Sequence, residues 1–214
     1  MNPELVAGAK FTGFLDIPLI KAPETIIIPS GIVPFSLKHR TDDYSQAVGF
    51  HELDLNFADV LHNPENYIAE LSKFAAVISP DCSLYRDAPL AVQIANIYRN
   101  RAIGSYYQRH GIYVIPQVRW GSEATYTTKY FSEKIAFLGV EKNSIVAIGT
   151  YGRIKTQNDK KHFKAGLKAL LETLSPKIVL VYGAMPDSVF GEFKTCTKFV
   201  SYPDWTTRMH GGGQ

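Results

Sequence analysis

The sequence lacks the features that mark several large classes of protein. Only two cysteines occur, Cys82 and Cys196, and they form no CxxC pair, so neither a disulfide framework nor a structural zinc site is indicated. No apolar run approaches the roughly 18 residues of a membrane span, and the first residues do not form a basic segment followed by an apolar one. We therefore expect a cytoplasmic protein in a reducing compartment, with no membrane partner.

The motifs of the best-marked enzyme classes are missing as well. The sequence contains no HExxH zinc motif, no nucleotide P-loop, no GxSxG elbow and no cysteine–histidine metal cluster. The turn GTYGR at 149–153 has neither P-loop nor GxGxxG spacing, so a plain strand-to-helix turn is the simpler interpretation. The residues indicate no cofactor and no metal site.

The overall composition is that of an ordinary globular protein. Its 214 residues are 45% hydrophobic and 20% charged, which is enough to fill a sizeable core and excludes a mainly disordered chain. A net charge of +3 permits a nucleic-acid partner without requiring one. The many tyrosines could stack on bases or sugars, or simply pack with their hydroxyls at the surface. Composition therefore leaves the partner open.

Short apolar runs alternate with amphipathic segments along the chain. Buried strands are expected at 47–50, 75–79, 113–116, 145–148, 178–181 and 199–201. The apolar runs at 26–28 and 32–35, split by Pro29, Ser30 and Gly31, suggest one broken strand or a strand and a turn. Helices are expected at 64–74, 89–110 and 162–174, and before 137. Residues 1–24 suggest an irregular lead-in, and the glycine-rich residues 206–214 suggest a flexible tail.

This order of elements predicts one α/β domain over residues 1–214, because no linker rich in proline, glycine or serine divides it. About seven short strands joined by helices must run mostly parallel. Right-handed crossovers then leave a small or incomplete TIM-like (β/α) barrel or an open doubly wound sheet. Polar residues follow nearly every strand, which favours the barrel, since an open sheet would gather them near one switch point.

Two carboxylates at strand ends are the candidate catalytic groups. Asp81 follows the run at 75–79 and Pro80, which would hold it rigidly, and Glu52 follows the run at 47–50. Breaking a glycosidic bond requires a carboxylate that stabilises an oxocarbenium-like centre or activates water. Asp81 is the first candidate and Glu52 the second. Each also has a structural interpretation, Asp81 as the cap of a turn and Glu52 as the partner of an arginine.

Amides, aromatics and cations near the same strand ends are the candidate binding residues. The helix at 89–110 carries an amide stripe at helical spacing, which either faces water or faces the site. The candidate substrate-binding residues are Tyr85, Gln93, Asn96, Asn100, Gln117, Trp120 and Tyr182. The candidate DNA phosphate-binding residues are Lys38, Arg40, Arg119, Arg153 and Lys155. For the basic segment 38–40 a solvated loop is the alternative.

The stretch SPDCSLYRDAPLAVQIANIYRNRAIGSYYQRHGIYVIPQVRW, residues 79–120, resembles an uncharacterised family of bacterial, plasmid and phage proteins known as DUF4417. The resemblance extends from about residue 50 to 182. It is carried by Pro80, Asp81, Ser83, Tyr85, Asp87, Pro89, Gln93, Asn96, Tyr98, Arg99, Arg101, Gly104, Gln108, Gly111, Val114, Ile115, Pro116 and Trp120. Cys82 departs from the pattern, because relatives often carry an aromatic residue there. The family is in turn similar to a phage-defence DNA glycosylase that acts on glucosylated hydroxymethylcytosine.

The resemblance implies hydrolysis of an N-glycosidic bond in double-stranded phage DNA. The target nucleotide would be flipped into the pocket, because its glycosidic bond is inaccessible within a duplex. Two alternatives stay open. A non-catalytic DNA-binding or replication-accessory protein of a mobile element would use the same basic loops without a catalytic carboxylate. A small-nucleotide glycohydrolase would use the same chemistry on a free ligand.

Overall fold

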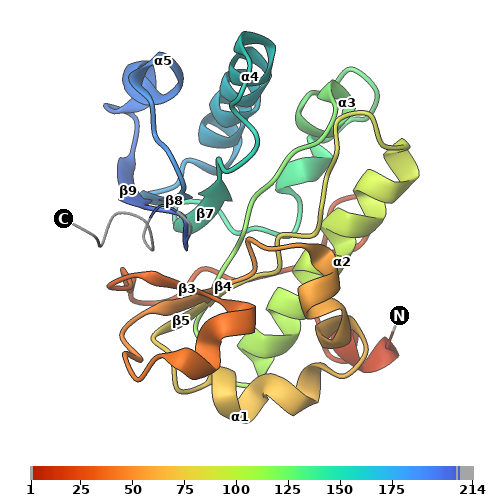
Figure 1. The fold of residues 1–214 in the computed structure, drawn as a ribbon. Coiled ribbons are helices and arrows are strands. Elements are labelled where there is room, and N and C mark those ends of the chain that lie inside the picture. Colours follow the sequence, from red (N-terminus) through yellow and green to blue (C-terminus); the bar gives the residue numbers. More distant parts are fainter. Residues whose placement is uncertain (1, 206, 208–214) are drawn as a thin grey trace, which may run out of the picture.

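Within the described residues, 2–205 and 207 of the computed structural model, seven parallel strands form two sheets. The first sheet has the order β3 (Ile32–Pro34), β4 (Ala47–Gly49), β5 (Ala76–Ile78) and β6 (Val114–Ile115). The second has the order β7 (Ile145–Gly149), β8 (Ile178–Tyr182) and β9 (Lys198–Tyr202) (Figure 1). β1 (Phe11–Thr12) and β2 (Ile17–Pro18) form a separate antiparallel pair.

The apolar runs form strands because both of their faces are covered. Every residue of β3 to β7 is buried, which is typical of parallel strands packed on two sides. β9 lies at an edge and is partly exposed. A single parallel bridge between Gln117 and Ala147 joins the end of the first sheet to β7. The strands therefore follow one another in chain order from β3 to β9.

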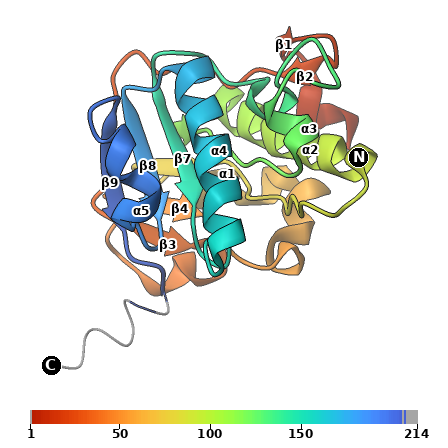
Figure 2. The same cartoon turned by 90° about the horizontal axis from the view of Figure 1, so that it is seen from above.

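Helices cover the outer faces of the two sheets. The α-helices are α1 (Ile68–Leu71), α2 (Leu90–Arg109), α3 (Glu123–Tyr126), α4 (Gln157–Leu174) and α5 (Asp187–Phe190). The 3₁₀ helices are η1 (Pro3–Val6), η2 (Phe35–Arg40), η3 (Asp54–Leu61), η4 (Pro64–Tyr67), η5 (Ile135–Phe137) and η6 (Gly191–Phe193). α4 and α5 lie against β7, β8 and β9, as the two views agree (Figures 1 and 2). Among the residues that the structure describes, no helix is long and apolar enough to cross a membrane.

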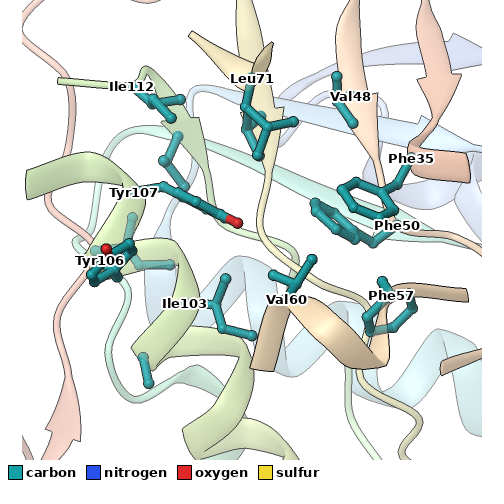
Figure 3. Packing of buried hydrophobic residues seen from close by; sticks show 14 of the residues in the cluster. Phe35, Val48, Phe50, Phe57, Val60, Leu71, Ile103, Tyr106, Tyr107 and Ile112 are labelled. Carbon is teal, nitrogen blue, oxygen red and sulfur yellow. The ribbon is translucent and has the colours of Figure 1, made fainter. Parts of the chain in front are cut away.

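The core is divided by the strands into inner and outer parts. Alternate residues of a strand point to opposite faces. Val48 packs outward with α2 and η3 (Figure 3), and Val77 belongs to the same outer cluster, whereas Ala47 and Ile78 face inward. A second outer cluster lies between the β7–β9 sheet and α4. The inner cluster contains side chains from the strands of both sheets. Both sheets therefore turn one face toward a common interior.

The α/β class and the parallel strands expected from the sequence are confirmed. The described strands do not form a closed barrel, because β3 and β9 each have a paired strand on one side only. Of the two apolar runs at 26–28 and 32–35, only the second contains a paired strand, β3. The predicted helix ending at 137 was also wrong, because only α3 and η5 form there. The predicted tail lies outside the described residues except for Thr207.

Candidate functional site

A large pocket opens at the carboxyl ends of the parallel strands. Its volume is about 1000 Å³. Its wall is formed mainly by segments that follow β4, β5, β6 and β7, and by the start of α4. Among its lining residues are His51, Glu52, Asp54, Asp81, Tyr85, Arg86, Arg119, Trp120, Tyr151, Arg153, Asp159 and His162. The carboxyl ends of parallel strands are where ligands bind in such folds, so this pocket is the candidate functional site.

Asp81 lies in the wall of this pocket as an oriented carboxylate. Its Oδ2 accepts a hydrogen bond from Arg119 Nη1 at 2.8 Å, and its Oδ1 accepts one from Gln117 Nε2 at 3.3 Å. The Asp81 side chain is 12% exposed. Burial by itself raises the pKa of Asp81, but the guanidinium groups of Arg119 and Arg153 help to bring it below its ordinary value. Asp81 is therefore ionised at neutral pH.

His51 is connected to Asp81 through Gln117. Because the Gln117 amide nitrogen donates to Asp81, its Oε1 faces His51 Nε2, 3.2 Å away, and that ring nitrogen must carry the hydrogen. Burial lowers the pKa of His51, which favours the neutral ring. The ring stacks on Tyr182 with 4.3 Å between centroids. His51 Nδ1 is then a buried acceptor, without a hydrogen-bond partner among the described residues.

Arg119 and Arg153 place two positive charges near the carboxylate of Asp81. Arg153 Nη2 donates to the Trp120 carbonyl at 2.8 Å, and its guanidinium lies 5.0 Å from the centroid of the Trp120 ring. Burial lowers the pKa of Arg153 to about 9, so it remains protonated at neutral pH. Arg153 Nη1 and Arg119 Nε have no hydrogen-bond partner in the described part of the chain. Two guanidinium groups beside one carboxylate suit an anionic ligand such as a phosphate.

Asn100, from the amide stripe of α2, holds the strand-end segments together. Its Nδ2 donates to the carbonyl of Pro80 and, at 3.3 Å, to that of Gln117. Its Oδ1 accepts from Ser79 Oγ at 3.0 Å. Asn100 is buried and does not line the pocket. It is therefore positioned to hold the segment that carries Asp81 rather than to touch a ligand.

Gln93 and Asn96, also in the stripe, bind other parts of the same segments. Gln93 Nε2 donates to the Ala88 carbonyl at 2.7 Å, and its Oε1 accepts from the Ser122 backbone nitrogen at 2.8 Å. Asn96 Nδ2 donates to the Ser83 carbonyl at 2.6 Å. Both side chains are buried, and neither lines the pocket. The stripe thus faces neither water nor the pocket. Its amides form hydrogen bonds with the chain segments that follow β5 and β6.

The two other acidic side chains after β4 are also held by hydrogen bonds. Glu52 lines the pocket, accepts from the Ser36 backbone nitrogen at 3.0 Å and also accepts from the Ser36 hydroxyl. Asp54 accepts from Ser83 Oγ at 2.8 Å and from the Ser83 backbone nitrogen at 3.1 Å. Glu52 therefore fastens η2 to this loop, and Asp54 fastens η3 to the loop after β5.

The predicted aromatic residues lie at different depths. Tyr85 is at the rim of the pocket and 61% exposed, and Trp120 is fully buried in its wall. Tyr182 does not line the pocket, but supports His51 by stacking, and its hydroxyl accepts from the Trp205 backbone nitrogen at 2.9 Å. Tyr85 is thus the predicted aromatic residue that is freest to touch a ligand.

Three of the predicted phosphate-binding residues lie outside the pocket lining. Lys38 forms an ion pair with Glu70 at 3.2 Å, and its Nζ lies 4.0 Å from the centroid of the Phe35 ring. Arg40 and Lys155 are exposed. They follow β3 and β7, so they lie on the same end of the strands as the pocket. Arg119 and Arg153 remain as the predicted cations within it.

His51 is a site residue that sequence reasoning did not select. It lies two residues after the buried strand β4, and Asp81 lies three residues after β5, so the position shortly after a strand was an available signal. Its bond with Gln117 spans 66 residues of the chain and has no local pattern. Asp159 and His162, at the start of α4, also line the pocket. A helix that begins beside a strand end brings its first turn to the site.

Comparisons with known proteins identify the family. The family model described as Domain of unknown function (DUF4417) matches residues 9–203. Over 166 residues the chain is 31% identical to the "Gene 1 protein" of Mycobacterium phage D29, a match covering 75% of this chain and 58% of that protein. It is 30% identical to the "Gene 1 protein" of Mycobacterium phage L5, covering 75% of this chain and 69% of that protein. No solved structure matches significantly. The chain therefore belongs to the DUF4417 family.

Proposed function

We propose that the protein is a hydrolase of N-glycosidic bonds, and that it acts as a DNA glycosylase on a sugar-bearing modified cytosine in phage DNA. The observation that carries this proposal is the ionised Asp81 carboxylate in the pocket, held by Arg119 and Gln117. Cleavage of a glycosidic bond develops positive charge on the sugar. A fixed anion stabilises that charge without having to reorganise.

In the proposed reaction Asp81 stabilises the cationic sugar or directs a water molecule to its anomeric carbon. The carbon–nitrogen bond breaks and its electron pair leaves with the base, which takes up a proton. The water oxygen bonds to the sugar and the water gives up a proton, so that one proton passes in net from the water to the base. Gln117 and Arg119 fix the direction of the Asp81 carboxylate. Glu52 is the second carboxylate available in the pocket.

The pocket also suits the proposed substrate class. Its volume of about 1000 Å³ lies at the upper end of the range for small-molecule sites, so it can accommodate a nucleotide with an attached sugar. Tyr85 at the rim offers a ring for stacking on a base. Arg119 and Arg153 line the pocket, and guanidinium groups attract a phosphate. These features support a nucleotide ligand.

We also propose that the seven parallel strands form an incomplete barrel. Three observations support this arrangement. The strands run in chain order with a bridge between Gln117 and Ala147, and both sheets contribute to the inner cluster. The Tyr202 hydroxyl, at the end of β9, donates to the Pro29 carbonyl shortly before β3, at 2.6 Å. The opening of the barrel would lie between these two edge strands.

The proposed activity is tested with matched DNA substrates. The protein is incubated with phage DNA carrying unmodified or glucosylated hydroxymethylated cytosine, and released bases and abasic sites are measured by mass spectrometry. We expect release from the modified DNA by the unchanged protein, and none by Asp81→Asn. Asp187→Asn is the matched control, because its side chain is 80% exposed on α5.

Two other results would replace the proposal. Salt-dependent binding to DNA without any product would favour a non-catalytic DNA-binding protein of a mobile element. Release of base from free nucleotides alone would favour a small-nucleotide glycohydrolase. Release from DNA by Asp81→Asn at an unchanged rate would remove Asp81 from the mechanism.

A further inference from the structure

The mouth of the pocket carries an unusual group of exposed apolar and aromatic side chains. The four most exposed large hydrophobic residues of the described chain are Leu55 at 85%, Leu53 at 72%, Tyr151 at 65% and Tyr85 at 61%. All four line the pocket. A single exposed leucine is ordinary, but a group of large apolar side chains around one cavity marks a surface that another molecule covers.

The backbone directs Leu53 and Leu55 outward. They flank Asp54, whose carboxylate is bound to the Ser83 backbone nitrogen and hydroxyl. The Asn56 backbone nitrogen donates to the Leu53 carbonyl at 2.8 Å, which closes the first turn of η3. Asp54 therefore anchors this turn to the loop after β5, while the leucines on either side of it face solvent.

The opposite side of η3 is anchored in the core. Phe57 and Val60 are buried, and the Phe57 ring lies 5.4 Å from that of Phe50 between centroids (Figure 3). These contacts fix the position of η3 relative to β4 and to the pocket. Leu53 and Leu55 thus lie at the start of a 3₁₀ helix whose other side is packed in the core, so their positions relative to the pocket are fixed.

We propose that Leu53 and Leu55 form an apolar wedge that enters the base stack of double-stranded DNA beside the flipped nucleotide. The inference rests on the proposed function and deepens it, because it identifies the substrate as a nucleotide within a duplex rather than a free one. Apolar side chains inserted between base steps unstack and kink a duplex. An extruded base also leaves a gap in the stack that leucine side chains can fill.

Exposed cations lie at the same end of the strands as the wedge, alongside the carboxylates of Glu52, Asp54 and Asp87 in the pocket lining. Arg86 is exposed and lines the pocket. Arg40 and Lys155 are exposed on the segments that follow β3 and β7, at the same end of the strands. Cations around an apolar centre match the phosphates that flank an opened base step. Duplex DNA is for this reason the occupant that we assign to the rim.

The wedge is tested by comparing the two strand states of one substrate. The double variant Leu53→Ala/Leu55→Ala is assayed on an oligonucleotide carrying the target base, either single-stranded or annealed. We expect base release from the duplex to fall by roughly tenfold or more, and release from the single strand to fall much less. Ile28→Ala is the control, because Ile28 is a 40% exposed aliphatic residue before β3, at the other end of the strand.

A second measurement does not require turnover. In the Asp81→Asn background, 2-aminopurine next to the target base should fluoresce more strongly when the protein binds the duplex, and this increase should be lost in the leucine double variant. Equal losses on both strand states, or no loss on either, would overturn the wedge and leave the proposed activity intact. If the unchanged protein releases no base, the proposed activity fails. The fluorescence then decides the wedge alone, and no increase would overturn it.

Discussion

Replacing Asn100 by alanine tests whether the amide stripe of α2 holds the site in place. The Asn100 side chain is 5% exposed, donates to the Pro80 and Gln117 carbonyls, and accepts from the Ser79 hydroxyl and from Arg101 Nη1. Alanine supplies neither donor nor acceptor. Gln117 O keeps its bond from Arg101 Nη1 at 2.7 Å, so the loss falls mainly on Pro80 and Ser79.

The expected cost follows from these contacts. A buried hydrogen bond contributes about 1 kcal/mol, and a buried group left without a partner costs about 1–3 kcal/mol. We therefore expect Asn100→Ala to lower the free energy of unfolding by about 2–3 kcal/mol. For a chain of this length the melting temperature should fall by roughly 4–12 °C.

Urea unfolding followed by circular dichroism measures this change. Asn158→Ala is the matched control, because Asn158 is exposed in the first turn of α4, and its free energy of unfolding should change by less than about 0.5 kcal/mol. Base release by Asn100→Ala should slow without a change in KM, because the loop carrying Asp81 is misplaced. If Asn100→Ala is as stable as the control but loses substrate binding, Asn100 contacts the substrate, and the structural role that we give it is wrong.

Two further predictions concern titration. Arg119→Gln removes a cation that helps to lower the pKa of Asp81, so this pKa should rise. The acid limb of the pH profile of base release should therefore move to higher pH. If the acid limb does not move, Asp81 is not the group that causes it. Burial raises the pKa of Cys82 to about 12, whereas Cys196 is exposed. A thiol reagent at pH 8 should therefore find one reactive cysteine in the folded protein and two in denaturant, and two fast reactions in the folded protein would contradict this.

Much of the fold was predictable because its strands are buried on both faces. Runs such as 145–148 and 178–181 contain apolar residues throughout, and they coincide with β7 and β8 within one residue at each end. The wrong predictions concern segments in which local helix propensity competes with tertiary contacts. Before 137 the chain was expected to be helical, yet outside α3 and η5 it follows an irregular course. Tertiary packing determines the conformation of such a segment, and the periodicity of the sequence does not reveal that packing.

The candidate site was predictable in position but not in connectivity. Asp81, Glu52 and Arg119 were selected because each follows a buried strand, and all three line the pocket. The connection from His51 through Gln117 to Asp81 joins three strand ends that are distant in sequence. Helical spacing likewise identified the amide stripe of α2, but only the packed structure decides which element that stripe faces.

Base release from modified DNA decides whether Asp81 in this pocket cleaves an N-glycosidic bond, as we propose. Purified protein, Asp81→Asn and the exposed-site control Asp187→Asn are incubated with DNA carrying glucosylated hydroxymethylcytosine, and released base is quantified by mass spectrometry. We expect release by the unchanged protein and by Asp187→Asn, and none by Asp81→Asn with its fold intact. Equal release by all three proteins, or release by none of them on any DNA or nucleotide, would contradict it.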